Sequence, residues 1–194
     1  KALSIDPNHA AALINMAMID QARGDRDSAL QRLRKVVARN TDYAEAHLNL
    51  GSLLGSMKKH DEAIQHLSKA VELNPKRTVA YLNLAGAYME TQQWVKAEEL
   101  YRHAQTLSPD MPYPHYGLGA LQARQAHHAD AVVSFRKAIS LGGSNPQTYT
   151  QLGLSLSALG EKPAAVEAFQ TALKLDPQHA GAKRALRENG FPVE

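Results

Sequence analysis

A pattern of 34 residues recurs five times in this chain, and this repetition constrains the fold more than any other feature of the sequence. A leucine followed by a small residue marks four copies, at Leu50-Gly51, Leu84-Ala85, Leu118-Gly119 and Leu152-Gly153, with Met16-Ala17 as a degenerate copy one step earlier. Alanine recurs at the same step, at Ala29, Ala63, Ala97, Ala131 and Ala165. A period of about 20 to 50 residues is typical of arrays of stacked structural units. We therefore expect one repeated unit.

Apolar residues within each copy recur at spacings of three and four residues twice, with a break between the two runs. This spacing is typical of an amphipathic helix. In the third copy the first run is Ala80, Leu84, Ala87 and Tyr88, and the second run is Ala97, Leu100, Tyr101 and Ala104. The sequence therefore predicts an all-α chain with two helices, joined by a turn, in each repeat.

Large residues stand at two further fixed places of the repeat. One place holds Leu13, His47, Tyr81, His115 and Tyr149, and the other holds Leu33, Leu67, Tyr101, Phe135 and Phe169. Proline closes three repeats at Pro75, Pro109 and Pro177. In these residues the chain resembles the tetratricopeptide repeat (TPR) family. The resemblance implies a right-handed α-solenoid of five tandem 34-residue helix-turn-helix repeats, followed by a C-terminal capping helix.

The repeat boundaries follow from this alignment. We expect residues 1–9 to be the end of a preceding, truncated repeat, and residues 180–194 to form the capping helix and tail. The five repeats are expected to span 10–43, 44–77, 78–111, 112–145 and 146–179. The small residues that follow the marker leucines, Gly51 among them, are expected to allow close approach of the paired helices, because a bulky side chain there would overpack the interface.

Three asparagines at 34-residue spacing are the most suggestive functional feature. The family resemblance implies that the first helices of the repeats line a concave binding surface, on which Asn15, Asn49 and Asn83 would stand in a row. An asparagine amide both donates and accepts, so such a row can hold a peptide by its main chain. It resembles the asparagine ladder in the repeat arm of O-linked N-acetylglucosamine transferase. Gly117 interrupts the row and Gln151 is a partial substitute. The alternative is that these asparagines bond neighbouring helices and serve the fold.

An apolar strip runs beside the asparagines on the same helices. Since the core positions are already taken by residues such as Leu50 and Leu84, a second stripe is surplus, and an exposed apolar stripe marks an interface. The strip consists of Ile14, Leu48, Leu82, Val79, Tyr113 and Tyr116. We expect it to receive apolar side chains of a bound peptide; the alternative is that the strip packs inward as core.

Composition narrows the function classes. The 194 residues contain no cysteine, which excludes disulfide frameworks and cysteine-based zinc sites. The net charge of +3 is too small to be the footprint of a nucleic-acid-binding protein. No apolar run approaches the roughly 20 residues that a transmembrane helix needs.

Acidic pairs and histidines give no catalytic or metal-binding pattern. Asp61-Glu62 falls at the start of a second helix, where acids favour the helix dipole. His60 and His66 are six residues apart and do not share a helical face as two metal ligands at i and i+4 would. We predict that they lie on the solvated surface, and that His47 and His115 lie in the core. The sequence thus predicts no catalytic residue, no metal site and no cofactor.

These observations favour a non-catalytic protein–protein interaction scaffold that binds an extended peptide or a disordered segment in its concave groove. Two alternatives stay open: a substrate-recruiting TPR arm of a larger enzyme such as a glycosyltransferase, and a scaffold that assembles with copies of itself. The expected partner is a protein or peptide, with no nucleic acid and no transmembrane segment. The absence of cysteine slightly favours the cytoplasm and leaves the compartment otherwise unassigned.

Overall fold

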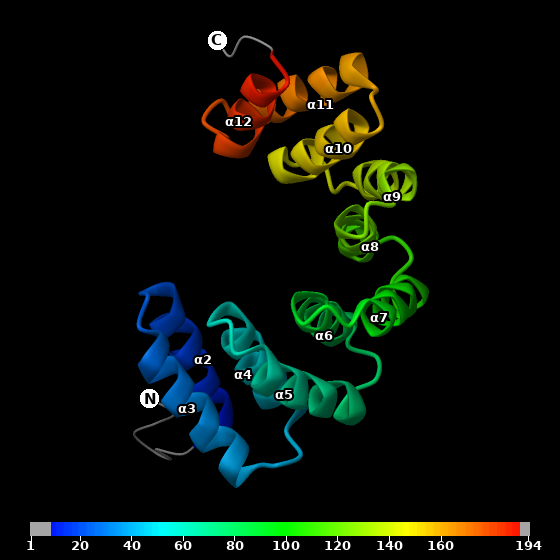
Figure 1. The fold of residues 1–194 in the computed structure, drawn as a ribbon. Helices are drawn as coiled ribbons and strands as arrows, with labels where there is room; N and C mark the ends of the chain where they lie inside the picture. Colours follow the sequence, from blue (N-terminus) through cyan, green and yellow to red (C-terminus); the bar gives the residue numbers. More distant parts are fainter. Residues whose placement is uncertain (1–8, 191–194) are drawn as a thin grey trace. The chain divides into compact units, whose positions relative to one another are not determined.

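The computed structural model describes residues 9–190 and contains, within that range, eleven α-helices and no strand (Figure 1). The helices are α2 (Ala10–Ala22), α3 (Arg26–Arg39), α4 (Ala44–Ser56), α5 (His60–Leu73), α6 (Thr78–Glu90), α7 (Trp94–Leu107), α8 (Pro112–Arg124), α9 (His128–Ser140), α10 (Pro146–Ala158), α11 (Lys162–Leu175) and α12 (Ala180–Glu188). The predicted all-α class of helical repeat solenoid is confirmed.

The helices keep the 34-residue step of the sequence. The first helices of the repeats begin at residues 10, 44, 78, 112 and 146, and α12 begins at 180. The second helices begin at residues 26, 60, 94, 128 and 162. We keep the division into repeats as a proposal. The expected end of a preceding repeat and the tail after residue 190 lie outside the described residues, apart from residue 9.

Small residues bring the two helices of a hairpin together. A Cβ atom added to Gly51 of α4 would lie 2.5 Å from Leu67 Cγ of α5, and one added to Gly153 of α10 would lie 2.5 Å from the ring of Phe169. Real Cβ atoms do not approach so closely, so a larger residue at either position would force the helices apart. A small residue is needed here for packing, as the sequence pattern indicated.

The turns inside the hairpins share one backbone geometry. The residue after each first helix and its cap has a positive φ angle: 83° at Gly24, 61° at Lys58, 58° at Gln92, 61° at Ala126 and 79° at Gly160. In each turn the next backbone N–H donates to a carbonyl five residues earlier, at 2.9 to 3.0 Å. This is the hydrogen-bond pattern of the Schellman motif, which ends a helix through one left-handed residue. Three of the five turns place a residue other than glycine in that conformation.

The chain divides into two compact units, residues 1–100 and residues 101–194, with the boundary inside α7. In the first unit the core is built by side chains such as Leu33, Leu50 and Leu67. In the second unit the core is built by Phe135, Phe169 and their neighbours. None of the helices in residues 9–190 is both long and apolar enough to cross a membrane.

Candidate peptide-binding site

Asn15, Asn49 and Asn83 stand on the first helices α2, α4 and α6 of the first unit, one on each helix. Asn15 is exposed, whereas Asn49 and Asn83 are half-buried. The three asparagines occupy the same position in successive first helices, because these helices begin 34 residues apart. The row that the sequence predicted is therefore carried by equivalent helices.

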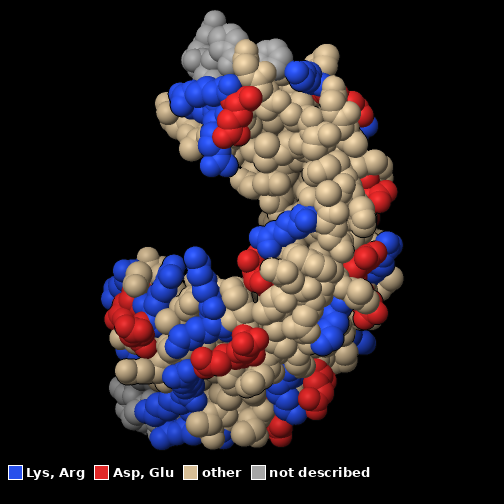
Figure 2. Space-filling view, in the orientation of Figure 1, with Lys and Arg blue, Asp and Glu red and all other residues tan. Residues whose placement is uncertain are grey.

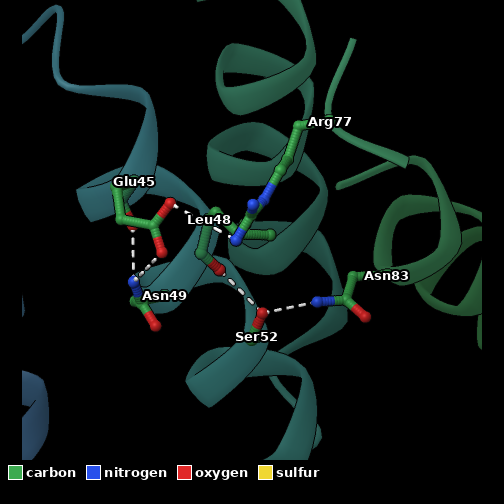
Figure 3. Close-up of polar contacts among 6 residues, drawn as sticks. All are labelled: Glu45, Leu48, Asn49, Ser52, Arg77 and Asn83. Carbon is green, nitrogen blue, oxygen red and sulfur yellow. Dashed lines mark hydrogen bonds and ion pairs between the residues drawn. The ribbon is translucent and has the colours of Figure 1, made fainter. Parts of the chain in front are cut away.

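The amide nitrogen of Asn49 is bonded within its own helix (Figure 3). It donates to the backbone oxygen of Glu45 at 2.7 Å and to Glu45 Oε1 at 3.3 Å. The other carboxylate oxygen of Glu45 lies 3.8 Å from an Arg77 guanidinium nitrogen, in the loop before α6. These contacts fix the orientation of the Asn49 side chain.

The amide nitrogen of Asn83 joins two adjacent repeats. It donates to Ser52 Oγ on α4 at 2.6 Å, and the Ser52 hydroxyl donates to the backbone oxygen of Leu48 at 2.7 Å. In Figure 3 the Oδ1 atoms of Asn49 and Asn83 have no dashed bond, since neither accepts a hydrogen bond within the described residues. The nitrogens therefore serve the fold, while both oxygens are available as acceptors.

A cavity of about 290 Å³ lies beside Asn83, between α4, α5 and α6. Its walls are mostly small or apolar, and its described lining residues are Gly51, Ser52, Gly55, His60, Leu67, Leu82, Asn83, Gly86, Ala87, Met89 and Glu90. The Nδ1 atom of His60 is buried and has no hydrogen-bond partner among residues 9–190. A buried polar atom without a partner costs free energy, and this atom belongs to a residue of the cavity wall.

The apolar strip does not form one exposed surface. Ile14 and Leu48 are only 4% and 6% exposed and belong to the core of the first unit. The interpretation of these two residues as surplus surface is wrong, because α2 and α4 pack against their own partner helices and also against each other. Two neighbouring positions per turn are therefore core.

The other four members of the strip are at least partly accessible. Leu82 is half-buried and lines the cavity beside Asn83. Val79 is 39% exposed, near the start of α6. In the second unit Tyr113 is 64% exposed on α8, and Tyr116 is half-buried with its ring 5.7 Å from that of Phe135. These residues lie in two places, one in each unit.

The row of asparagines has no counterpart in the second unit. Gly117 occupies the equivalent position on α8, and the ring of Tyr101 fills the space that a side chain there would need. Gln151 on α10 is half-buried, and its backbone oxygen accepts from Ser155 Oγ at 3.1 Å. The acceptor row is thus a feature of α2, α4 and α6.

Comparison with known families decides the identity of these repeats. The family described as the cilia and flagella-associated protein 70 C-terminal domain, a TPR domain, matches residues 4–190. The chain belongs to this TPR family. No curated protein sequence matches the chain.

Solved TPR structures resemble the chain in fold. The Cut9–Hcn1 heterotetramer of the APC/C aligns with 98% of this chain and 39% of its own chain, at 18% identity and a TM-score of 0.85. TTC0263, a TPR protein of Thermus thermophilus, aligns with 94% of this chain and 100% of its own, at 18% identity and a TM-score of 0.80. YrrB, described as a TPR protein with an unusual peptide-binding site, aligns over 96% of both chains, at 18% identity and a TM-score of 0.68. At these identities the similarity shows the TPR fold alone.

Two histidines of this TPR chain form a polar pair that the sequence did not reveal. His47 is buried, as predicted, and its Nε2 donates to the backbone oxygen of Thr41 at 3.0 Å. Its Nδ1 lies 3.1 Å from Nδ1 of His66. Since a carbonyl only accepts, His47 carries its proton on Nε2, and His66 Nδ1 must be the donor of the second bond. His66, which the sequence predicts on the solvated surface, is half-buried there against His47.

Burial affects the pKa of His66. Desolvation lowers the pKa of His66 below its ordinary value, His47 and Arg34 lower it further, and Glu62 opposes them. Desolvation also lowers the pKa of His115 on α8, whose Nδ1 lies 3.1 Å from Gln105 Nε2. Both imidazoles are therefore held neutral. Among residues 9–190 no three metal-ligating side chains gather into a site.

Sequence reasoning missed Ser52 and His60. Ser52 is ordinary by type, and its role depends on Asn83 of the next repeat reaching it. The sequence interpretation placed His60 on the solvated surface, but its Nδ1 is buried at the cavity. The small residues Gly51, Gly55 and Gly86 could have predicted the cavity, because facing helices without large side chains leave a hollow between them.

Proposed function

We propose that the chain is a non-catalytic interaction scaffold that binds an extended peptide or disordered segment along α4 and α6. The observation that carries this proposal is the pair of unused acceptors, Asn49 Oδ1 and Asn83 Oδ1, together with the cavity of about 290 Å³ that Asn83 lines. An extended main chain presents N–H donors whatever its side chains are. The asparagines would then supply affinity, and the cavity would supply selectivity.

The site is built before any ligand arrives. The nitrogens of both amides are already bonded, so their oxygens are held in place. Binding to a preformed site costs less side-chain ordering than binding to a mobile one. A side chain of the peptide would enter the cavity that Leu67 and Gly86 help to line.

The acidic residues support a non-catalytic role. The pair Asp61-Glu62 lies in the first turn of α5, and Glu62 Oε2 accepts from an Arg34 guanidinium nitrogen at 2.8 Å. Such a carboxylate is engaged in an ion pair on the outer surface. The description of YrrB as peptide-binding and the assembly of Cut9 with Hcn1 are in keeping with an interaction role for TPR structures. A TPR arm of a larger enzyme would use the same site for recruitment.

Peptide display tests the proposal. A random peptide library is panned against the chain, and enriched peptides are measured against Asn49→Ala/Asn83→Ala. We expect about a tenfold or greater loss of affinity, because two main-chain hydrogen bonds are lost. Asn83→Asp keeps an oxygen acceptor and should retain most of the affinity.

Ser52→Ala is the matched control for the structural part of the Asn83 contact. It removes the partner of the amide nitrogen but keeps the Asn83 acceptor, so any loss of affinity measures how much the fixed orientation of the amide contributes. If all variants bound the enriched peptides equally, the asparagines would serve the fold alone. Sedimentation over a range of concentrations separates a peptide partner from a second copy of the chain.

A further inference from the structure

We infer that the second unit carries a separate docking site for an uncharged, proline-rich segment. The site is a hollow of about 400 Å³ between the first turn of α8, the loop after α9 and the start of α10. Its aromatic wall is made by Tyr113 and Tyr116, and Pro112 lies at its edge. The site shares no residue with the one on α4 and α6, so it does not depend on the function proposed for that site.

The loop that shapes this hollow differs from the other loops between repeats. The second helix α9 has 13 residues, whereas α3, α5, α7 and α11 each have 14. It ends early because Gly142 has a φ angle of 90° and Gly143 N–H donates to the Ala138 oxygen at 2.9 Å. A Cβ on Gly143 would lie 2.7 Å from that oxygen and 2.8 Å from Pro112 Cβ. Only glycine lets the loop lie this close to α8.

The walls are fixed in position. Asn145 Oδ1 accepts from Thr148 N–H at 2.9 Å, and Asn145 Nδ2 donates to the Gly143 oxygen at 3.2 Å. Tyr116 packs on Phe135 with the rings tilted by 53°. Tyr113, by contrast, is 64% exposed, so its ring is open to a ligand. The hollow is therefore preformed, with one accessible aromatic face.

The chemistry of the lining selects the occupant. Among the described residues that line the hollow none is charged, and α10 contains no charged residue at all. Figure 2 shows the surface over α10 without blue or red side chains. A charged side chain would lose hydration here without gaining an ion pair, so the matching segment is neutral.

Proline fits this hollow better than other neutral residues. Its ring can stack on Tyr113, and it brings no backbone N–H that the aromatic side of the hollow would leave without a partner. Aromatic-lined grooves bind proline-rich segments because the polyproline II helix is already formed before binding. Gln147 lines the hollow and supplies donors for the carbonyl groups of the segment.

Fluorescence anisotropy with labelled decaproline tests the inference. The comparison probe is a labelled Gly-Ser repeat of the same length, which has no ring and a flexible backbone. We expect saturable binding of decaproline and none of the Gly-Ser probe. Tyr113→Ala should weaken decaproline binding by about tenfold, as for an aromatic anchor of an interface. Tyr113→Phe should stay within about twofold, since the ring is kept.

Two control variants locate the effect. Val133→Ala truncates an exposed apolar residue of α9 that does not line the hollow. Asn49→Ala/Asn83→Ala alters only the first unit, so both controls should bind decaproline as the unchanged chain does. The inference is overturned if decaproline fails to saturate by about 1 mM, if both probes bind alike, or if Tyr113→Ala binds like the unchanged chain. Failure here leaves the site on α4 and α6 standing.

Discussion

The ring of Tyr101 on α7 occupies the space that a side chain at Gly117 of α8 would need. This contact explains why the row of asparagines stops at Asn83. The Tyr101 ring packs in the space beside position 117, within the second unit. An asparagine side chain could stand there only if this ring moved.

Restoring the asparagine should therefore damage the fold. We predict that Gly117→Asn lowers the free energy of unfolding by about 2 kcal/mol or more, because overpacking and a displaced ring act together. Urea denaturation measures the change. Gly55→Ala is the matched control, since its new Cβ would meet Ala63 Cβ at an ordinary 4.0 Å. An unchanged midpoint for Gly117→Asn would contradict the role given to Tyr101.

The hairpin turns offer a gain in stability. Lys58, Gln92 and Ala126 hold positive φ angles that glycine adopts without strain. Replacing any of them by glycine should raise the free energy of unfolding by about 0.5 kcal/mol, the relief of strain exceeding the added entropy of the unfolded chain. Gly24→Ala and Gly160→Ala should lower it. Urea midpoints test all five changes, and a lower midpoint for Ala126→Gly would refute the reasoning.

Stability should fall in acid through His66. Its pKa is depressed in the folded state, so the unfolded chain binds more protons as the pH falls below the ordinary histidine value of about 6.5. The stabilisation is complete above that pH and is lost as the pH falls through the folded-state pKa. Urea unfolding at several pH values should show this slope. His66→Gln, which can still donate to His47, should have a shallower one, with His115 contributing the remainder.

The bond between Asn83 and Ser52 should couple two repeats. We predict that Asn83→Ala and Ser52→Ala each cost about 1 kcal/mol, and that the double variant costs clearly less than their sum. A double-mutant cycle in urea measures this coupling energy. Asn15→Ala, at the exposed equivalent position on α2, should leave stability unchanged. Strict additivity of the two single variants would mean that the bond contributes nothing.

The fold could be predicted from the sequence because the repeat spacing fixes both helices and turns at once. The site could be predicted only in part. Ile14 and Leu48 look like surplus apolar residues until the packing of successive first helices is known. Ser52 gains its role only through Asn83 in the next repeat. The hollow beside Tyr113 depends on where α9 ends, which a change of one residue in helix length decides.

Hydrogen bonds run from Asn83 through Ser52 to Leu48, and a peptide bound at Asn83 would act on them. A hydrogen bond accepted by Asn83 Oδ1 polarises the same amide, and it strengthens the bond that the nitrogen already donates. A bound main chain would thus lengthen an existing relay that links α6 to the backbone of α4. Peptide binding would therefore reduce the motion of α6 relative to α4 without displacing either helix.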